Sequence, residues 1–222
     1  MKIDVVGVSG SPVKNGNVEA FLDRMIETAE SRDEVGAEAI HLSRREVRGC
    51  IHCNFCLRKQ EPGRYCSQKD DLQPVFERIE RADVLILASP VYFMRTSGQM
   101  ASFLDRLRVF VFGNVAGGKL RNKVGVSLAV AWGRNAGLET THLSHIYAFL
   151  AHEMIPVGVH HSGSPLGISA LATEHGMGAV EKGLRHGALQ DAMAANAAEA
   201  MIDRGIGLAR TIKAGSLQMQ EK

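Results

Sequence analysis

Four cysteines, all between residues 50 and 66, are the residues most suited to chemistry in this sequence. They follow the spacing C-x2-C-x2-C-x9-C and are Cys50, Cys53, Cys56 and Cys66. Three thiolates at intervals of three residues can wrap one iron–sulfur cubane in a tight loop, with a fourth arriving from further along the chain. Zinc sites with four cysteines usually pair two separated C-x2-C hooks. The spacing therefore favours an iron–sulfur cluster, with a zinc site or free thiols as the alternatives.

The gap before Cys66 contains residues 60–64, Gln-Glu-Pro-Gly-Arg, whose composition is typical of a turn. Such a turn can return Cys66 to the other three thiols or carry it away from them. Both possibilities remain open at the fourth ligand position. Because cysteine is confined to residues 50–66, a disulfide framework is not expected, and reduced thiols fit better.

A second loop of interest spans residues 9–17, Ser-Gly-Ser-Pro-Val-Lys-Asn-Gly-Asn. It joins an apolar β-branched run to a helical pattern, and backbone N–H groups at the start of such a helix attract anions. The hydroxyls of Ser9 and Ser11 and the amide of Asn17 can add further hydrogen bonds to one phosphate. The loop lacks both GxxxxGK[ST] and GxGxxG, so a mononucleotide is favoured over ATP or NAD. The alternative is a simple turn rich in Ser, Gly and Pro.

The elements that must position these loops alternate between strand and helix patterns. Strands are expected at residues 3–9, 37–42, 84–88, 124–130 and 154–159, and helices near 18–29, 72–79, 100–107 and 143–150. The run at 84–88 is apolar throughout, as expected of a strand that is covered on both faces. Parallel strands need crossover connections, which helices supply. We therefore predict an α/β fold, a flavodoxin-like doubly wound five-stranded parallel sheet of order 2-1-3-4-5.

The chain, residues 1–222, is expected to form one domain, because its length and 45% hydrophobic content suffice for one core. Residues 47–69 then form a cysteine loop inserted after the second strand. Residues 160–186 are rich in glycine without a clear period, and an alanine-rich helix follows at roughly 188–213. We interpret 160–222 as a C-terminal extension, in which the irregular segment 160–186 is a candidate lid or oligomer contact and the helix packs on the sheet or on another subunit.

Charge and hydropathy argue against two classes of partner. The formal charge is only +2 and the basic residues are dispersed, which does not favour nucleic acid. The amino-terminal sequence has neither the long apolar region of a signal peptide nor that of a membrane span. We therefore expect a cytoplasmic protein that does not bind membranes.

Two stretches, VVGVSGSPVKNGNVEAFLD and ADVLILASPVYFMRTSGQMASFLDRL, resemble the NADPH-dependent FMN reductase family over roughly residues 1–160. The cysteine segment is similar to that of the iron–sulfur flavoprotein branch. This resemblance implies that the cysteines bind a [4Fe–4S] cluster and that three loops bind FMN. The first holds the phosphate through Ser9, Ser11, Pro12, Lys14 and Asn17. The second lies along the isoalloxazine through Pro90, Val91, Tyr92 and Phe93, and the third closes over the ring through Trp132, Gly133 and Arg134.

Some of these side chains have a second interpretation. Tyr92 and Phe93 could cap the core beyond a buried strand, and Arg134 could face solvent instead of the flavin. The resemblance further implies an FMN-dependent oxidoreductase that passes electrons between FMN and the cluster. NAD(P)H, ferredoxin and quinone are candidate redox partners, and the expected assembly is a homodimer or homotetramer. The alternatives are a cluster-free NAD(P)H-dependent FMN or quinone reductase and a non-catalytic redox carrier or sensor.

Overall fold

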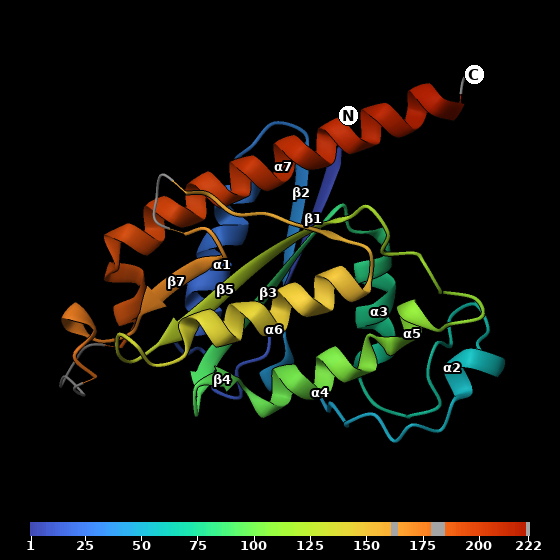
Figure 1. Cartoon of the computed structure of the whole chain (residues 1–222), viewed down its shortest axis with the longest axis horizontal. Helices are drawn as coiled ribbons and strands as arrows, with labels where there is room; N and C mark the ends of the chain where they lie inside the picture. Colours follow the sequence, from blue (N-terminus) through green and yellow to red (C-terminus); the bar gives the residue numbers. More distant parts are fainter. Residues whose placement is uncertain (161–163, 179–184, 221–222) are drawn as a thin grey trace.

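A computed structural model describes residues 1–160, 164–178 and 185–220 (Figure 1). Its sheet has the order β2-β1-β3-β5-β6, and every neighbouring pair along this path is parallel. These strands are β1 (Ile3–Ser9), β2 (Val35–His41), β3 (Val84–Tyr92), β5 (Val124–Ala131) and β6 (Ile155–Pro156). The predicted doubly wound parallel fold is confirmed, and the four longer strands lie where the apolar runs placed them.

The fifth position of the sheet differs from the prediction. Only Ile155–Pro156 of the expected strand at 154–159 pairs with β5, at its beginning. A further strand, β7 (Ile168–Leu171), pairs in parallel with the end of β5. Proline cannot donate to a strand ladder, so the chain leaves the edge soon after Pro156 and returns later. The stretch 160–186 was therefore wrongly expected to be irregular throughout, although 161–163 and 179–184 lie outside the described residues.

Helices cover both faces of the sheet (Figure 1). On one face lie α1 (Asn17–Glu30) and α7 (Ala192–Gln220), and on the other lie α3 (Leu72–Arg81), α4 (Gly98–Arg106) and α6 (Leu138–Ala151). None of the helices in the described ranges is long and apolar enough to cross a membrane. Shorter segments complete the described fold: η1 (Leu42–Arg44), α2 (Phe55–Arg58), β4 (Arg95–Thr96), α5 (Arg108–Val111), η2 (Glu174–Gly176) and η3 (Gly187–Gln190).

Strand side chains alternate between two apolar cores. In β3, Val84 and Ile86 pack toward α1 and α7, whereas Leu85 and Leu87 pack toward α3 and α4. All four are at most 1% exposed, so both faces of this strand are withdrawn from water. This two-sided burial explains the uniformly apolar sequence, and it leaves the loops at the strand ends to carry the polar chemistry.

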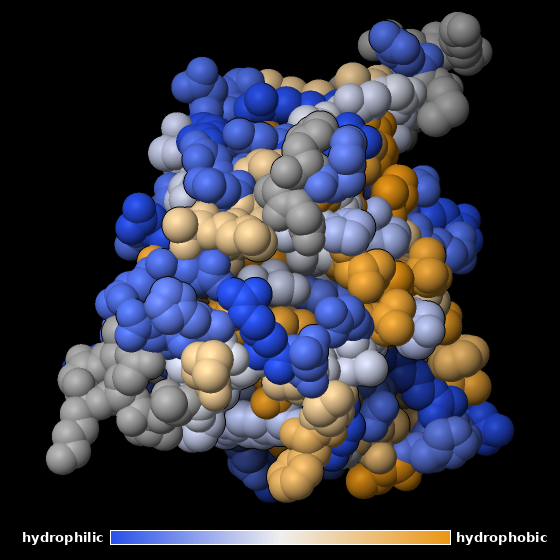
Figure 2. Space-filling view, turned by 60° about the vertical axis from the view of Figure 1, so that its left-hand side comes forward, coloured by the Kyte–Doolittle hydropathy of each residue, from blue (hydrophilic) through white to orange (hydrophobic). Residues whose placement is uncertain are grey.

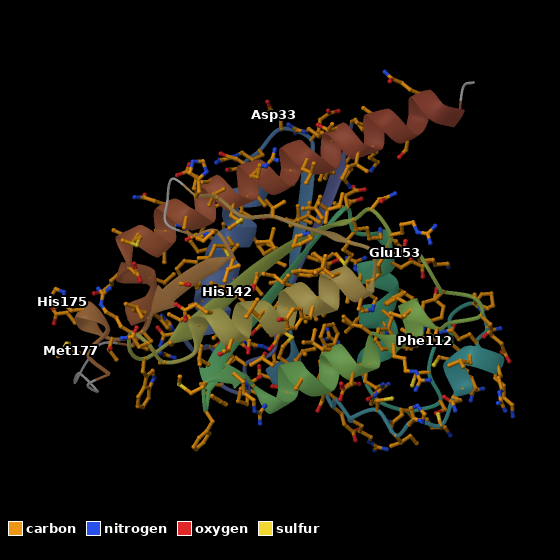
Figure 3. All side chains as sticks on the ribbon, in the orientation of Figure 1. Asp33, Phe112, His142, Glu153, His175 and Met177 are labelled. Carbon is orange, nitrogen blue, oxygen red and sulfur yellow. The ribbon has the colours of Figure 1, made fainter. Side chains whose placement is uncertain are left out.

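Helix α6 packs closely on β5 because β5 has small residues on that face. A Cβ at Gly125 would lie 2.5 Å from Phe149 Cγ, so only glycine fits there. Two residues on, the Ser127 hydroxyl lies 2.8 Å from Nδ1 of both His142 and His145. Figure 3 shows His142 near the amino end of α6, toward β5. The two histidines are 2% and 0% exposed, and burial lowers their pKa to about 4 and about 3 respectively.

Candidate functional site

A cleft of about 840 Å³ lies at the carboxyl ends of the strands, where the loops after β1, β3 and β5 meet. Its volume is in the range of small-molecule sites, and this edge of an open parallel sheet is where ligands bind. Figure 2 brings this end of the molecule forward and shows apolar patches within a mainly hydrophilic surface. The structure brings together many of the predicted cofactor residues here: Ser11, Lys14, Asn17, Pro90, Val91, Tyr92, Phe93 and Trp132.

Four predicted residues do not line this cleft: Ser9, Pro12, Gly133 and Arg134. Ser9 is fully buried, and its hydroxyl accepts a hydrogen bond from the Ser11 N–H at 3.3 Å, so it shapes the loop from behind. Arg134 donates its Nε–H to the His175 carbonyl at 3.0 Å and lines a neighbouring pocket. Figure 3 shows His175 at the edge of the molecule, pointing outward.

The loop at residues 9–17 is preshaped by hydrogen bonds within the chain. The Ser11 hydroxyl accepts from the Val13 N–H at 3.1 Å, and the Glu19 carboxylate accepts from the Asn15 N–H at 2.7 Å. Glu19 is buried and also accepts from the Ser43 hydroxyl. Burial opposes its charge, yet the hydrogen bonds from Ser43 and Asn15 hold the pKa of Glu19 below its ordinary value. The loop is thus fixed before any ligand arrives.

Two cations, Lys14 and Arg185, line the cleft, and no aspartate or glutamate is among its described lining residues. Arg185 comes from the C-terminal extension, which contacts the 9–17 loop. His186 Nε2 lies 2.9 Å from the Asn15 carbonyl, and Asn17 Oδ1 accepts from the Ala188 N–H at 2.9 Å. This end of the cleft therefore favours an anion. The sequence contained no signal for Arg185.

The end of β3 and the turn after it present apolar side chains to the cleft, and the loop predicted at residues 90–93 is strand up to Tyr92. Tyr92 is 41% exposed and Phe93 is 99% exposed, so Phe93 does not cap the core. Phe93 and Met94 both have positive φ, at 48° and 63°, a conformation that costs energy for non-glycine residues. Together with Trp132, which is also exposed and lines the cleft, these residues give it an apolar end suited to a flat aromatic ring. Met94 was not predicted.

All four cysteines line a second pocket, beside the start of α5. The turn predicted at 60–64 is present as an isolated bridge between Glu61 and Arg64, and it returns Cys66 to this pocket. Gln60, 4% exposed, anchors the turn by donating to the carbonyls of Tyr65 and Val109 at 3.1 and 3.0 Å.

The thiols share a pocket but do not converge on a point. The pocket volume is only about 20 Å³, and among described residues no three His, Cys, Asp or Glu side chains are arranged to hold a metal ion. Cys50 and Cys53 are exposed, whereas Cys56 is buried. The hydrogen bond to Ser67 lowers the pKa of the Cys53 thiol, and burial raises that of Cys56.

The profile of the NADPH-dependent FMN reductase family matches residues 3–167. The chain belongs to this family. Within it, the chain groups with the iron–sulfur flavoproteins: one from Methanocaldococcus jannaschii is 38% identical over 168 residues, which cover 73% of this chain and 82% of the relative. Membership makes the chain an FMN-dependent oxidoreductase.

Solved structures agree on the fold. RosB, crystallised with a bound riboflavin 5′-phosphate derivative, aligns with a TM-score of 0.69 at 13% identity, covering 99% of this chain and 88% of RosB. A flavodoxin from the domain Archaea aligns with a TM-score of 0.52 at 13% identity, covering 95% of this chain and 99% of that one. The flavodoxin-like class predicted from the sequence is thereby confirmed.

Replacing Gly137 with alanine is expected to weaken flavin binding at least roughly tenfold, about 1.4 kcal/mol. Gly137 has φ of +100°, and a Cβ there would lie 2.4 Å from Met94 Cα, so the loop carrying Phe93 must shift. Titration of the apoprotein with FMN measures the change. Gly98→Ala is the control, because that position is exposed with nothing within 4 Å of a new Cβ. Equal affinities for the two variants would contradict a supporting role for Gly137.

Proposed function

We propose that this oxidoreductase binds FMN in the cleft at the strand ends and exchanges electrons between FMN and a [4Fe–4S] cluster held by Cys50, Cys53, Cys56 and Cys66. The observation that carries the proposal is that the two ends of the cleft differ in chemistry, one being cationic and the other apolar. One end has the preshaped 9–17 loop with Lys14 and Arg185, and the other has Tyr92, Phe93 and Trp132. A phosphate at the first end would place a flat aromatic ring at the second.

The residues of the cleft fit FMN better than a dinucleotide. Ser11, Lys14 and Arg185 would bind its single phosphate, while Pro90, Val91 and Tyr92 would lie along the ring. Bound FMN supplies both hydride and single-electron chemistry. The apolar side chains keep water from the ring, and the backbone of the loop after β3 fixes its orientation. The riboflavin 5′-phosphate derivative in RosB supports the same class of ligand.

The cysteine loop has the donor set that an iron–sulfur cluster requires. Four thiols line one pocket, which the turn at 61–64 makes possible by returning Cys66. The pocket must widen to admit a cluster, and Cys50 and Cys53 are the exposed cysteines of the four. The name of the Methanocaldococcus relative, an iron–sulfur flavoprotein, supports this assignment.

The two sites lie on different sides of the domain. In Figure 1, α2 of the cysteine loop is at the right-hand side and β4, next to the cleft, is at the lower left. Electron exchange within one subunit would therefore have to pass from one side of the domain to the other. We propose that the protein is a homodimer or homotetramer in which the cluster of one subunit approaches the FMN of a neighbour. NAD(P)H, ferredoxin or a quinone would be the redox partner.

The FMN assignment is tested by Ser11→Asp. FMN is expected to co-purify with the wild-type protein, and the variant is expected to lose it, because a carboxylate beside the phosphate adds like charge. Ser216→Asp, on an exposed position of α7, should keep wild-type flavin content. Flavin content is measured by absorbance and mass spectrometry of the released cofactor. FAD as the released cofactor, or full FMN occupancy in Ser11→Asp, would refute the assignment.

The cluster assignment is tested by metal and sulfide analysis. Protein purified without oxygen is expected to contain about four irons and four sulfides per chain. Cys53→Ser and Cys66→Ser should each lower both contents, whereas FMN content should stay unchanged. If sulfide is absent under strict anaerobiosis, the cluster-free NAD(P)H-dependent FMN or quinone reductase is the correct assignment. Steady NAD(P)H oxidation that does not depend on the cysteines would confirm that alternative.

A further inference from the structure

Two arginines, Arg106 and Arg108, line the same pocket as the four cysteines. Arg106, the last residue of α4, is 2% exposed, and Arg108 begins α5. A buried guanidinium normally satisfies all its N–H groups, because each unsatisfied one costs about 1–3 kcal/mol.

These two arginines do not satisfy all of theirs. Arg106 donates through Nη1 to the Arg48 carbonyl at 2.8 Å, and through Nη1 and Nη2 to the Asp70 carboxylate at 2.6 and 3.2 Å. Arg108 donates through Nη2 to Asn54 Oδ1 at 2.8 Å. In both side chains Nε is buried without a hydrogen-bond partner. Among the buried side-chain atoms of the described residues, only two others, His41 Nδ1 and Gln99 Oε1, share this condition.

The coincidence of two unpaired donors and four thiols in one pocket indicates a missing acceptor. Neutral thiols are weak acceptors, whereas the thiolate and sulfide sulfurs of a cluster are negatively charged. The charges around the pocket are compatible with an anion. Asp70 pairs with Arg106, and Arg108 has no carboxylate within salt-bridge distance among the described residues. Asp105, the one acid lining the pocket, is exposed, so solvent screens it.

We propose that Arg106 and Arg108 form the floor of the cluster site and raise its reduction potential by donating their Nε–H groups to cluster sulfurs. This inference rests on the cluster assignment in the proposed function. Reduction adds an electron to the cluster and increases the negative charge on its sulfurs. Hydrogen bonds and positive charge therefore stabilise the reduced state more than the oxidised state. Arg106 has a second task, since it binds Arg48 and Asp70, the two ends of the cysteine loop, at once.

Arg108→Met and Arg106→Lys test the two donors separately, with Arg58→Met as the matched control. Arg58 is an exposed arginine in the same loop that does not line the pocket. Arg106→Lys keeps a cation beside Asp70 but removes the Nε–H. Each protein is titrated potentiometrically without oxygen, and the reduced cluster is followed by electron paramagnetic resonance. Iron and sulfide contents and the melting temperature of the apoprotein are measured in parallel.

We expect the ratio of reduced to oxidised cluster at a fixed potential to fall roughly tenfold in Arg108→Met, the equivalent of one hydrogen bond to a charged group. Arg58→Met should match the wild type. If Arg106→Lys fails to fold, Arg108→Met decides, because its guanidinium does not join the ends of the loop. If the wild type has a full cluster and the variants keep its reduction potential and iron content, the proposed role of Arg106 and Arg108 is refuted, while the cluster assignment stands. A wild type without iron and sulfide would refute both the floor and the proposed cluster.

Discussion

Replacing Asp70 with asparagine is expected to lower the free energy of unfolding by about 3–5 kcal/mol. The side chains of Asp70 and Arg106 are each 1% exposed, so the variant leaves an uncompensated charge in the interior. Although burial disfavours its charge, the hydrogen bonds from Arg106 and from the Arg48 N–H hold the pKa of Asp70 below its ordinary value. The carboxylate is therefore ionised at pH 7, and the full cost applies there.

Urea unfolding of the apoprotein at pH 7 measures this cost. Asp203→Asn is the matched control, since Asp203 also pairs with an arginine, Arg32, at 2.7 Å but is 54% exposed. Exposed pairs contribute about 0–1 kcal/mol, so the control should unfold almost as the wild type does. Proteolysis within residues 47–69 should also quicken in Asp70→Asn, because a neutral amide accepts the Arg48 N–H more weakly than a carboxylate does. Equal unfolding free energies for both variants would contradict a structural role for the buried pair.

The elements of the fold were predictable because their patterns are local. The apolar runs of β1, β3 and β5 and the helical spacing of α1 and α3 each reside in fewer than fifteen residues. Helix α6 was harder, because His142 and His145 occupy core positions where an amphipathic pattern has apolar residues. The prediction of the edge strand at 154–159 failed for a different reason. Its pairing with β5 is shared by two segments, β6 and β7, separated by residues 157–167.

The site was predictable only where one loop supplies its own residues. The 9–17 loop and the 90–93 segment at the end of β3 each contribute neighbours in sequence, so their composition suggested a phosphate end and a ring end. Arg185 joins the same cleft through contacts such as that between His186 and Asn15, which are 171 residues apart. Arg106 was equally invisible, because an arginine in a helix is usually exposed and its partner Asp70 is 36 residues away.

The buried histidines are expected to make the protein sensitive to acid. Thr96 donates its hydroxyl hydrogen to the Ser89 hydroxyl at 2.9 Å, so toward His145 Nε2, 3.5 Å away, Thr96 can act only as an acceptor. The one proton of the neutral His145 ring is therefore on Nε2. His145 Nδ1 then accepts from the Ser127 hydroxyl, which in turn accepts from His142. Both rings are neutral in this arrangement, and a proton added to either would break the chain of hydrogen bonds.

The sign of the pH effect follows from the folded and unfolded pKa values. Unfolded histidine titrates near 6.5, whereas burial lowers the pKa of His142 to about 4 and that of His145 to about 3. The unfolded chain therefore binds more protons below pH 6.5, and stability falls as the pH drops from there toward 4. Between pH 7 and pH 4.5 the loss should be about 2–3 kcal/mol for each histidine. The sum is a large part of a typical folding free energy.

Urea unfolding at pH 7 and pH 4.5 tests this expectation with His145→Gln and, as control, His175→Gln. His145→Gln should be less stable than the wild type at pH 7 but lose less stability on acidification, since one titrating group is gone. His175 has a side chain that is 80% exposed, so its replacement should leave the pH dependence unchanged. An equally steep dependence in His145→Gln would show that other groups cause the acid sensitivity.

The chain of hydrogen bonds continues from Thr96 to the cleft. Ser89, which accepts from Thr96, donates to the Pro90 carbonyl at 2.8 Å, and Pro90 lines the cleft. Flavin should therefore be released over the same range of pH.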